Sequence, residues 1–419
     1  MHSHTWRMLP YLLFAAGCLA QNASPTRALT WQDTQAKFRA NNPTLLAGRA
    51  SIDESRADEI TAYLRPNPTL NFTADSLAIL TYHPFRPLAN LIPTASIDYL
   101  HEREHKRELR LASAQGATAI AISGQADLER NLMYNLRDAF VRVLQAKAIR
   151  EVARENLDYY DKEISINRMR FQAGGMARVD FQRVELQRVQ YQSDLATAEV
   201  NLRTAKIDLL SLLHDNTSVE QFDVTEPFDF SDSIASLQDL RALALDTRPD
   251  LKQAEKSLDK ARTDHQLAIA NGSSDPTFSF DVARQVPVEA YVGIGVSFPL
   301  RIFDRNQGEK LRTQIDIGRN EKLHDAAEMG VLHDVDSAYA TLQSTLQLLR
   351  PYKATYLQEA KDVRETITFS YLHGAASLLD FLDAQKEYRD TELNYLNLVG
   401  AYLSAANQVN FAVGREVIR

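Results

Sequence analysis

The chain contains two copies of one pattern, and this duplication limits its possible folds more than any other feature. Three pairs of segments align without a gap, in the same order in both halves. Such an order predicts two structural copies. Each copy reads as a helix, two strands, a very long helix, a tight glycine turn and a return helix. The matching pairs are residues 171–181 with 371–381, 68–72 with 276–280, and 42–43 with 248–249.

The long helices are the second constraint. The stretch from about Arg103 to Phe171 contains no proline and only two glycines, and its apolar residues recur at helical spacing. At 1.5 Å per residue such a helix is a rod of about 100 Å. Its counterpart, from about Asn306 to Tyr371, contains Pro351, which predicts a kink or a loosened turn there. The content of only 15 Gly and 14 Pro in 419 residues argues against an all-β protein rich in tight turns.

Both return helices carry an apolar stripe with steps of three and four residues, which is typical of coiled-coil packing. In the second copy the stripe is Phe381, Gln385, Tyr388, Glu392, Tyr395, Val399, Tyr402, Ala406, Val409 and Val413. In the first copy it is Leu186, Val189, Ser193, Ala196, Val200, Ile207 and Leu210.

Four short strands alternate apolar and polar residues, as in Leu70, Phe72 and Ala74 against Asn71 and Thr73. Segments of roughly 9–11 residues with this alternation are typical of a barrel that faces lipid outside and water inside. A soluble amphipathic sheet is the alternative. Four strands cannot close a barrel, and open edges are not tolerated in lipid, so a membrane-spanning sheet requires several chains.

The N-terminus predicts export. Arg7 precedes a short apolar run from Met8 to Gly17, which is typical of a secretory signal and too short to span a bilayer. Cys18 follows Ala-Ala-Gly, as in the lipobox of bacterial lipoproteins, and we expect it to be acylated. The alternative is cleavage elsewhere, after Ala20 or Ala23. Later apolar runs are too short for a transmembrane helix.

Charge and motifs exclude several functions. With 47 Lys and Arg against 55 Asp and Glu, the net charge of −8 has the wrong sign for nucleic-acid binding. A single cysteine excludes a disulfide framework and a thiolate zinc site. The sequence has no Gly-x-Ser-x-Gly, Walker or dinucleotide motif, so we expect that the protein is not an enzyme and binds no cofactor. Because no ATP-binding motif is present, energy for any transport must come from a partner protein.

These patterns predict the following division of the chain. We expect a signal peptide over 1–17, helical segments over 30–66, 103–213, 237–272 and 305–413, strand hairpins over 68–101 and 275–300, a linker over 214–236 and a C-terminal tail over 414–419.

The architecture resembles the TolC family of bacterial outer-membrane efflux ducts from about Leu29 to Gly414. The resemblance rests on the duplicated plan, the Asn-Pro and Arg-Pro helix starts, the glycine turns and the string from Tyr371 to Ala384. The strings Phe298 to Gly308 and Tyr99 to Arg107 are similar to strand-to-helix junctions of the CzcC/CusC-like outer-membrane components of heavy-metal efflux systems.

The resemblance implies a mainly α protein with a transmembrane β-barrel portion. Three protomers would form a 12-stranded barrel in outer-membrane lipid, continuous with an α-helical coiled-coil tunnel in the periplasm. The homotrimer would bind a periplasmic adaptor and work with an inner-membrane RND pump, and it would export solutes passively, with heavy-metal cations as the expected cargo. The first alternative is export of drugs or other organic solutes, and the second is a periplasmic coiled-coil scaffold without a pore.

The resemblance also assigns site residues. Asp380 and Asp383 match aspartates that ring the periplasmic entrance, and Tyr371 matches a tyrosine that latches it, whereas Ala376 replaces the basic latch residue. The alternative for Asp380 is helix capping, which we also expect for Asp180, its first-copy equivalent. Two further sets complete the candidates. They are the tip-turn glycines Gly174, Gly175 and Gly374, expected to contact the adaptor, and His101 and His105, a weak metal pair at helical spacing.

Overall fold

The computed structural model describes residues 28–77, 84–88, 90–231, 234–285 and 288–418. The predicted signal peptide and Cys18 lie outside the described residues. The first copy comprises α1 (Trp31–Asn41), α2 (Pro43–Tyr63), β1 (Thr69–Asp75), β2 (Ile92–Leu100), α3 (Lys106–Gln172) and α4 (Arg178–Leu212). The second comprises α5 (Leu237–Thr247), α6 (Pro249–Ala270), β3 (Thr277–Gln285), β4 (Val288–Ser297), α7 (Gln307–Pro351), α8 (Leu357–Leu372) and α9 (Leu378–Val413).

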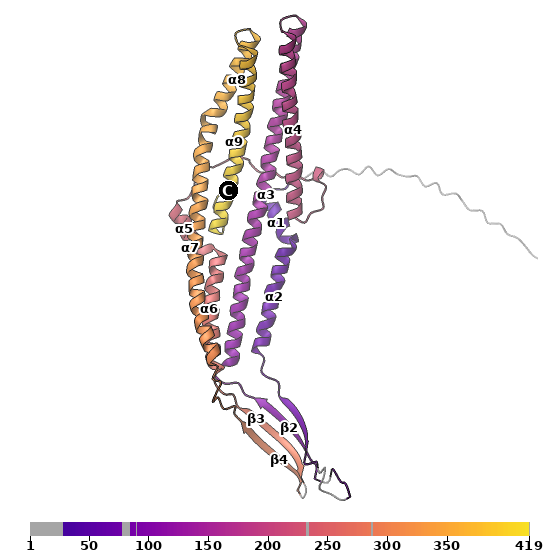
Figure 1. Cartoon of the computed structure of the whole chain (residues 1–419), viewed down its shortest axis with the longest axis vertical. Coiled ribbons are helices and arrows are strands. Elements are labelled where there is room, and N and C mark those ends of the chain that lie inside the picture. The colour runs from indigo at the N-terminus through magenta and orange to yellow at the C-terminus, as the bar shows by residue number, and fades with distance from the viewer. Residues whose placement is uncertain (1–27, 78–83, 89, 232–233, 286–287, 419) are drawn as a thin grey trace, which may run out of the picture.

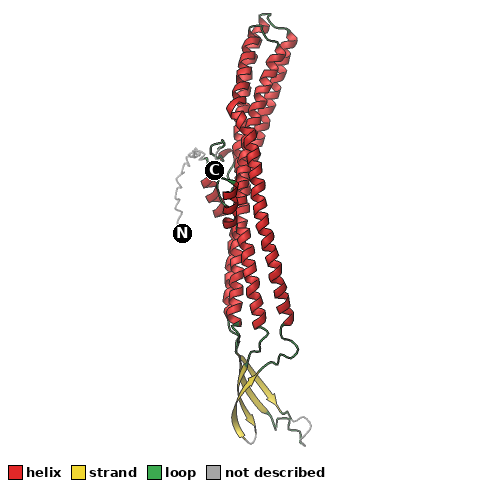
Figure 2. Ribbon diagram, turned by 90° about the vertical axis from the view of Figure 1, so that its left-hand side faces the viewer, coloured by secondary structure: helices red, strands yellow, loops and turns green. Residues whose placement is uncertain are grey.

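The molecule is a long rod with the sheet at one end and two helical hairpins at the other (Figures 1 and 2). The hairpins are α3 with α4 and α8 with α9. Nearer the sheet, α2 packs on α3, and α6 lies between α3 and α7. The predicted duplication of helix, two strands and long helix is confirmed. Among the described helices, none is long and apolar enough to cross a membrane.

The four strands form one antiparallel sheet in the order β1-β2-β3-β4. Ile97 is paired with Leu70 on one side and with Phe280 on the other, and Phe280 is paired with Ile294. Because paired residues point to the same face, these four side chains form an apolar row across the sheet. All four are exposed. The predicted alternation is confirmed, and one face of the sheet is apolar.

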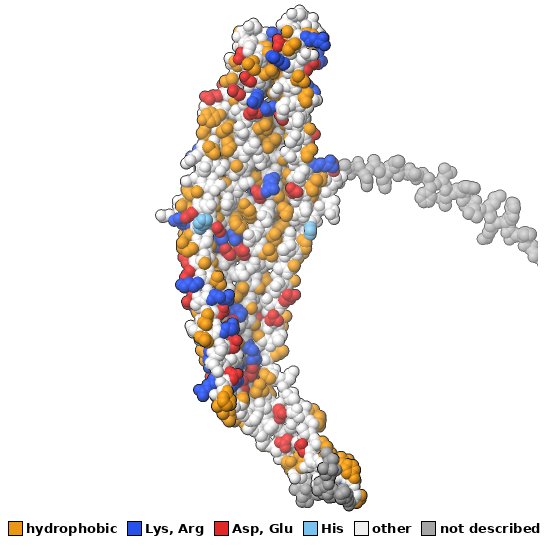
Figure 3. All heavy atoms as spheres, in the orientation of Figure 1, with side chains coloured by type: hydrophobic (Ala, Val, Ile, Leu, Met, Phe, Trp, Pro, Cys, Tyr) orange, Lys and Arg blue, Asp and Glu red, His pale blue; other side chains and the backbone are white. Residues whose placement is uncertain are grey.

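The opposite face of the sheet is polar and carries carboxylates. Asn71 donates a 2.7 Å hydrogen bond to Asp98, and Ser96 is paired with Asp281. A Cβ atom on Gly293 would lie 2.5 Å from the Asp281 carboxylate, so glycine makes room for this side chain. Figure 3 shows acidic side chains on the side of the sheet that faces the viewer.

Pro351 interrupts the second long helix as predicted. The backbone forms a π-helical turn over Tyr352–Tyr356, directly after the proline, and this turn separates α7 from α8. Lys353 makes two 2.8 Å contacts with the Asp229 carboxylate, so the segment after α4 is fastened to this turn.

The two return helices differ in what they bury. On α9 the predicted stripe is confirmed, with Phe381, Val399 and Tyr402 fully buried. On α4 most of the predicted stripe is exposed, including Leu186 at 71% and Val200 at 63%. Within this chain α4 packs through another set of residues. That set is Phe181, Val184, Tyr191, Ala198, Leu209 and Leu210, of which only Leu210 belongs to the predicted stripe.

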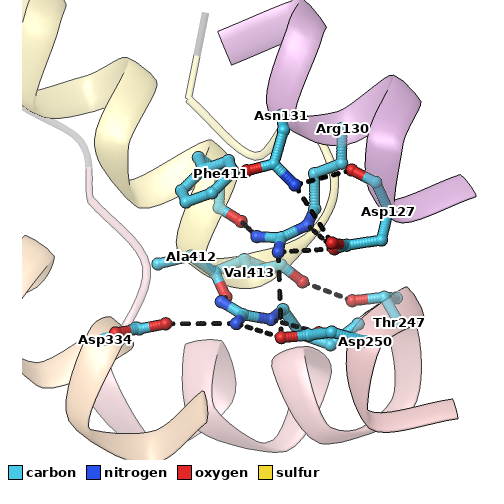
Figure 4. Close-up of polar contacts among 10 residues, drawn as sticks. Asp127, Arg130, Asn131, Thr247, Asp250, Asp334, Phe411, Ala412 and Val413 are labelled. Atoms are coloured by element: carbon cyan, nitrogen blue, oxygen red, sulfur yellow. Dashed lines mark hydrogen bonds and ion pairs between the residues drawn. The ribbon is translucent and has the colours of Figure 1, made fainter. Parts of the chain in front are cut away.

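A polar cluster halfway along the rod joins the two copies (Figure 4). It binds the last carbonyl groups of α9, which have no partner within the helix. Arg130 of α3 donates to Phe411 O at 2.8 Å, and Arg248, which is 4% exposed, donates to Ala412 O at 3.1 Å. Arg248 also forms a bidentate ion pair with Asp250. The Arg-Pro helix start thus differs in role from Asn42-Pro43, where Asn42 caps its own helix.

Candidate gate at the hairpin tips

Both hairpins turn through a glycine in the left-handed conformation. Gly174 has φ +76° and Gly374 has φ +77°, and nothing lies within 4 Å of a Cβ built on either. The next residues close each helix, since Gly175 N donates to Arg170 O and Ala375 N to Ser370 O, both at 2.8 Å. Gly175 itself lacks a positive φ, so its backbone conformation does not require glycine. The turns are open at the end of the rod.

Asp380 sits in a capping box at the start of α9. Its carboxylate accepts hydrogen bonds from the Ser377 hydroxyl at 2.7 Å and from Ser377 N at 3.0 Å. The Ser377 hydroxyl in turn accepts from Asp380 N. These side-chain and backbone hydrogen bonds lower the pKa of Asp380. The structure therefore shows the capping role directly, and the carboxylate is also exposed.

Asp383 lies one turn further along α9 and is exposed. It lines a groove between α8 and α9, together with Tyr356, Glu359, Lys386, Glu387 and Asp390. This groove carries four acidic side chains and one lysine, which favours cations over anions.

The first-copy equivalent of the capping box is incomplete. Asp180 lies in the first turn of α4, where its negative charge interacts favourably with the helix dipole. The N-cap position, however, is Ala177, which makes no side-chain capping bond. A capping box needs a hydroxyl at the N-cap, and of the two return helices only α9, with Ser377, has one.

Tyr371 connects the two hairpins. It is 7% exposed, and its hydroxyl donates a 3.0 Å hydrogen bond to Asn167 Oδ1 of α3. Its ring stacks on Phe381, with centroids 4.8 Å apart, and the Arg170 guanidinium lies 4.9 Å from the ring centroid. Burial raises the pKa of Tyr371, so the hydroxyl stays protonated and keeps donating. Ala376 packs against the same cluster.

A second contact between the hairpins centres on Arg364 of α8. Its guanidinium lies 3.6 Å from the ring centroid of Tyr388 on α9 and 4.4 Å from that of Tyr159 on α3. Such stacking is favourable for a desolvated cation. One helical turn away, Asn156 of α3 donates a 3.0 Å hydrogen bond to Glu392 of α9. A polar seam therefore joins α3 to α8 and α9.

Glu163 of α3 belongs to this seam and is 6% exposed. Its Oε2 atom has no hydrogen-bond partner within the part of the chain that the structure describes. Burial raises the pKa of Glu163, and the Tyr159 hydroxyl and the charge of Arg364 offset only part of that rise. The carboxylate is therefore a destabilising group at neutral pH in this arrangement.

Sequence reasoning missed the α3 side of this seam. The spacing carries a signal, because four residues that face this region step 4, 3, 4 along one face of α3. Three of the four are polar at positions where a coiled coil normally carries apolar residues. The residues are Asn156, Tyr160, Glu163 and Asn167.

The weak metal pair is not supported. His101 follows the end of β2, and His105 is the left-handed N-cap residue of α3, so the two do not share a helical turn. The assumed spacing of one turn is wrong because α3 begins only at Lys106. Throughout the described residues, no group of three or more His, Cys, Asp or Glu side chains is arranged to hold a metal ion.

The fold and the tips define a class of protein, an elongated duct protomer with an amphipathic sheet at one end and two helical hairpins at the other. The chain belongs to the outer membrane efflux protein family, whose model matches residues 36–213 and 240–415. It is accordingly an efflux channel protein of the outer membrane and not an enzyme.

Two curated relatives span nearly the whole chain. The cobalt-zinc-cadmium resistance protein CzcC of Cupriavidus metallidurans is 23% identical, over 92% of this chain and 90% of its own length. The outer membrane protein TolC of Vibrio cholerae is 22% identical, over 97% and 95%.

Solved structures show the same fold. A CusC crystal structure superposes with a TM-score of 0.76 at 17% identity, covering 97% of this chain and 99% of that chain. The outer membrane protein VceC of Vibrio cholerae gives a TM-score of 0.74 at 15% identity, covering 92% and 96%. The predicted fold class is thereby confirmed.

Proposed function

We propose that three copies of this chain form the exit duct of a tripartite RND-type efflux system that exports heavy-metal cations. The duct would be passive, and a periplasmic adaptor and an inner-membrane RND pump would deliver the cargo. The observation that carries the proposal is the amphipathic sheet with an edge strand at each side.

The sheet cannot be complete within one chain. Its outer strands, β1 and β4, each pair with only one described strand. In lipid an open edge leaves backbone groups without hydrogen bonds at a cost of several kcal/mol each. Pairing β4 of one copy with β1 of the next removes every edge, and three copies supply the 12 strands of a closed barrel. The apolar face then meets lipid and the polar face lines the lumen.

The helices support the same assembly. The stripe of α4 that includes Leu186, Val189 and Val200 is 58–71% exposed and has coiled-coil spacing. Soluble monomers rarely expose continuous apolar surface of this extent, and a second helix would cover it. We infer that this second helix belongs to the neighbouring copy. Contacts of this kind between all three copies would close a tunnel.

The hairpin tips are the proposed gate and adaptor surface. Threefold repetition places six carboxylates, from Asp380 and Asp383, around one axis, where they attract cations. The hydrogen bond from Tyr371 to Asn167 joins the two hairpins, and it would hold the gate closed. Gly174, Gly175 and Gly374 lie in the hairpin turns, at the end of the rod opposite the sheet (Figure 1), and would contact the adaptor.

Heavy-metal cations are the preferred cargo for two reasons. CzcC, named for cobalt, zinc and cadmium resistance, matches almost the full chain. In addition, Asp98 and Asp281 lie on the polar face that would line the lumen, and carboxylates favour cations. Export of drugs or other organic solutes through the same duct is the second candidate.

Cells with and without this chain distinguish the two cargoes. We expect the deletion to retain zinc, cobalt, copper or silver while a fluorescent drug-like dye is exported normally. Retention of the dye alone would support the organic-solute duct, and unchanged levels of both would contradict an efflux role in those cells. Acylation of Cys18 stays a prediction, which mass spectrometry of the mature N-terminus tests.

A further inference from the structure

Four of the six residues from Phe298 to Phe303, between β4 and α7, expose large apolar side chains. Phe298 is 54% exposed, Leu300 80%, Ile302 61% and Phe303 91%. Four such side chains within six residues form an apolar patch, which we call the foot. Figure 3 shows hydrophobic side chains where the sheet joins the helices, below a group of Lys and Arg side chains.

The foot is held in place through its backbone. Ser274 Oγ donates to Pro299 O at 2.6 Å, and Gln307 Nε2 donates to Phe303 O at 3.1 Å. Just beyond it, Asn306 Nδ2 donates to Ala268 O at 2.7 Å, which fixes the start of α7 on α6. These bonds fix the backbone of the loop while its apolar side chains stay exposed, so their exposure is a feature of an ordered loop.

The corresponding junction of the first copy has the opposite chemistry. Between β2 and α3 the chain reads His-Glu-Arg-Glu-His, and Glu102 there forms an ion pair with Arg110. The turn before β3, residues 271–276, is polar as well. The duplication therefore offers an internal control, and an apolar surface is not a requirement of the junction as such.

Length and charge indicate what the foot meets. A transmembrane strand needs about 9–11 residues, and β4 has 10, so Phe298 and its successors fall at the edge of the hydrocarbon layer. Aromatic and aliphatic side chains together with arginine are typical of this layer. Arg301 lies between Leu300 and Ile302, and Arg305 follows Phe303 by two residues and donates from Nε to Arg301 O at 3.2 Å, so the loop carries two cations beside its apolar side chains.

We propose that the foot is inserted into the phospholipid leaflet on the periplasmic side of the outer membrane. Leu300, Ile302 and Phe303 contact acyl chains, and the two arginines bind headgroup phosphates. The foot thereby sets the depth of the barrel in the bilayer. This inference rests on the proposed orientation of the sheet in the membrane.

The rival occupant is a second copy of the chain. Barrel closure would bring β4 beside β1 of the neighbour, whose preceding residues Tyr63 and Leu64 are also exposed. Contact of the foot with those residues would remove it from lipid. A crosslinker at the foot would capture phospholipid in the first case and a neighbouring chain in the second.

Site-specific photo-crosslinking in the full chain, expressed in the outer membrane of a Gram-negative host, separates them. Benzoylphenylalanine replaces Phe303, and in a second variant Leu300, since both are exposed and tolerate an aromatic group. Ile294 on the apolar face is the lipid control, and Ser297 on the polar face is the matched control on the same strand. We expect phospholipid adducts at both foot positions, at least about tenfold above Ser297.

The outcomes are distinguishable. Lipid adducts at the foot and at Ile294 support the inference. Chain-to-chain adducts at the foot, or no adduct there while Ile294 still captures lipid, overturn the inference and leave the proposed duct intact. Absence of lipid adducts at Ile294 contradicts the membrane orientation of the sheet itself, and the foot falls with it.

Discussion

The two aspartates at the start of α9 differ in how the fold uses them. Asp380 is engaged by Ser377 in a capping box, whereas Asp383 faces an acidic groove. A carboxylate that accepts two hydrogen bonds still carries its full charge, and its lowered pKa keeps it ionised. Asp380 can therefore both cap α9 and attract cations, whereas Asp383 does not cap the helix.

Replacing both aspartates tests the gate. We expect Asp380→Ala with Asp383→Ala to raise single-channel conductance and reduce block by divalent cations, because six carboxylates leave the constriction. Asp383→Ala alone should give much of this effect, whereas Asp380→Ala also removes the capping box and destabilises the first turn of α9. Asp180→Ala is the matched control. Unchanged conductance and block in the double variant would remove these residues from the gate.

Glu163 predicts a pH-dependent stability. Burial raises its pKa in the folded chain, so its contribution is fully favourable below the ordinary value of 4.5 and is lost as the pH rises through the raised pKa. We expect Glu163→Gln to be more stable than the parent by about 1 kcal/mol at neutral pH, with the difference vanishing below pH 4.5.

Thermal unfolding followed by circular dichroism across pH measures this difference. The comparison cancels groups that titrate in both proteins, such as Asp250, whose pKa falls because its bonds to Arg248 outweigh its burial. A Gln variant less stable than the parent at neutral pH would show instead that the charge of Glu163 supports Arg364.

At the scale of elements, much of the fold follows from local pattern. Strand alternation, the proline-free length of α3 and the interruption at Pro351 each reflect one local rule, and each is confirmed. The stripe of α4 could not be assigned in the same way, because α4 has two apolar stripes and only tertiary packing selects the one that faces α3.

The site was less predictable, for similar reasons. The tip glycines follow from turn chemistry, but the partner of Tyr371, Asn167, is 204 residues away and no local rule connects them. The helical spacing assumed for His101 and His105 was wrong because α3 begins only at Lys106. Long-range polar contacts were therefore the main omission.

The tip turns allow a matched pair of substitutions. Gly174→Ala places a Cβ in a left-handed backbone without any clash, so we expect only a strain cost of about 1 kcal/mol, confined to the end of α3. Gly175→Ala, at a residue without positive φ, should cost much less. Hydrogen exchange at the tip amides measures both. Equal loss of protection in the two variants would contradict the assignment of strain to Gly174.

At the scale of the whole molecule, the proposed assembly rests on surfaces that a single copy leaves uncovered. The sheet has two edge strands, and α4 exposes an apolar stripe along its length. Within the copy, the two hairpins are joined near their tips by Tyr371 and by Arg364. An assembly that opens must break these contacts within protomers while keeping those between them.

Charged substitutions on α4 test the assembly. We expect Leu186→Glu with Val200→Glu to abolish heat-resistant trimers, because two carboxylates per copy would be buried in an apolar seam. Gln192→Glu, which adds a charge at an exposed polar position of the same helix, should leave trimers intact. Semi-native electrophoresis of outer-membrane extracts measures this. Intact trimers in the double variant would place the seam elsewhere.

The central claim is that copies of this chain together form a water-filled duct across the outer membrane. Conductance of the purified full chain in a planar bilayer tests it most directly. The account predicts discrete channels that favour cations over anions, with openings that increase when Tyr371→Phe removes the bond to Asn167. A protein that inserts without conducting, or that stays out of the bilayer as a soluble monomer, would contradict the account.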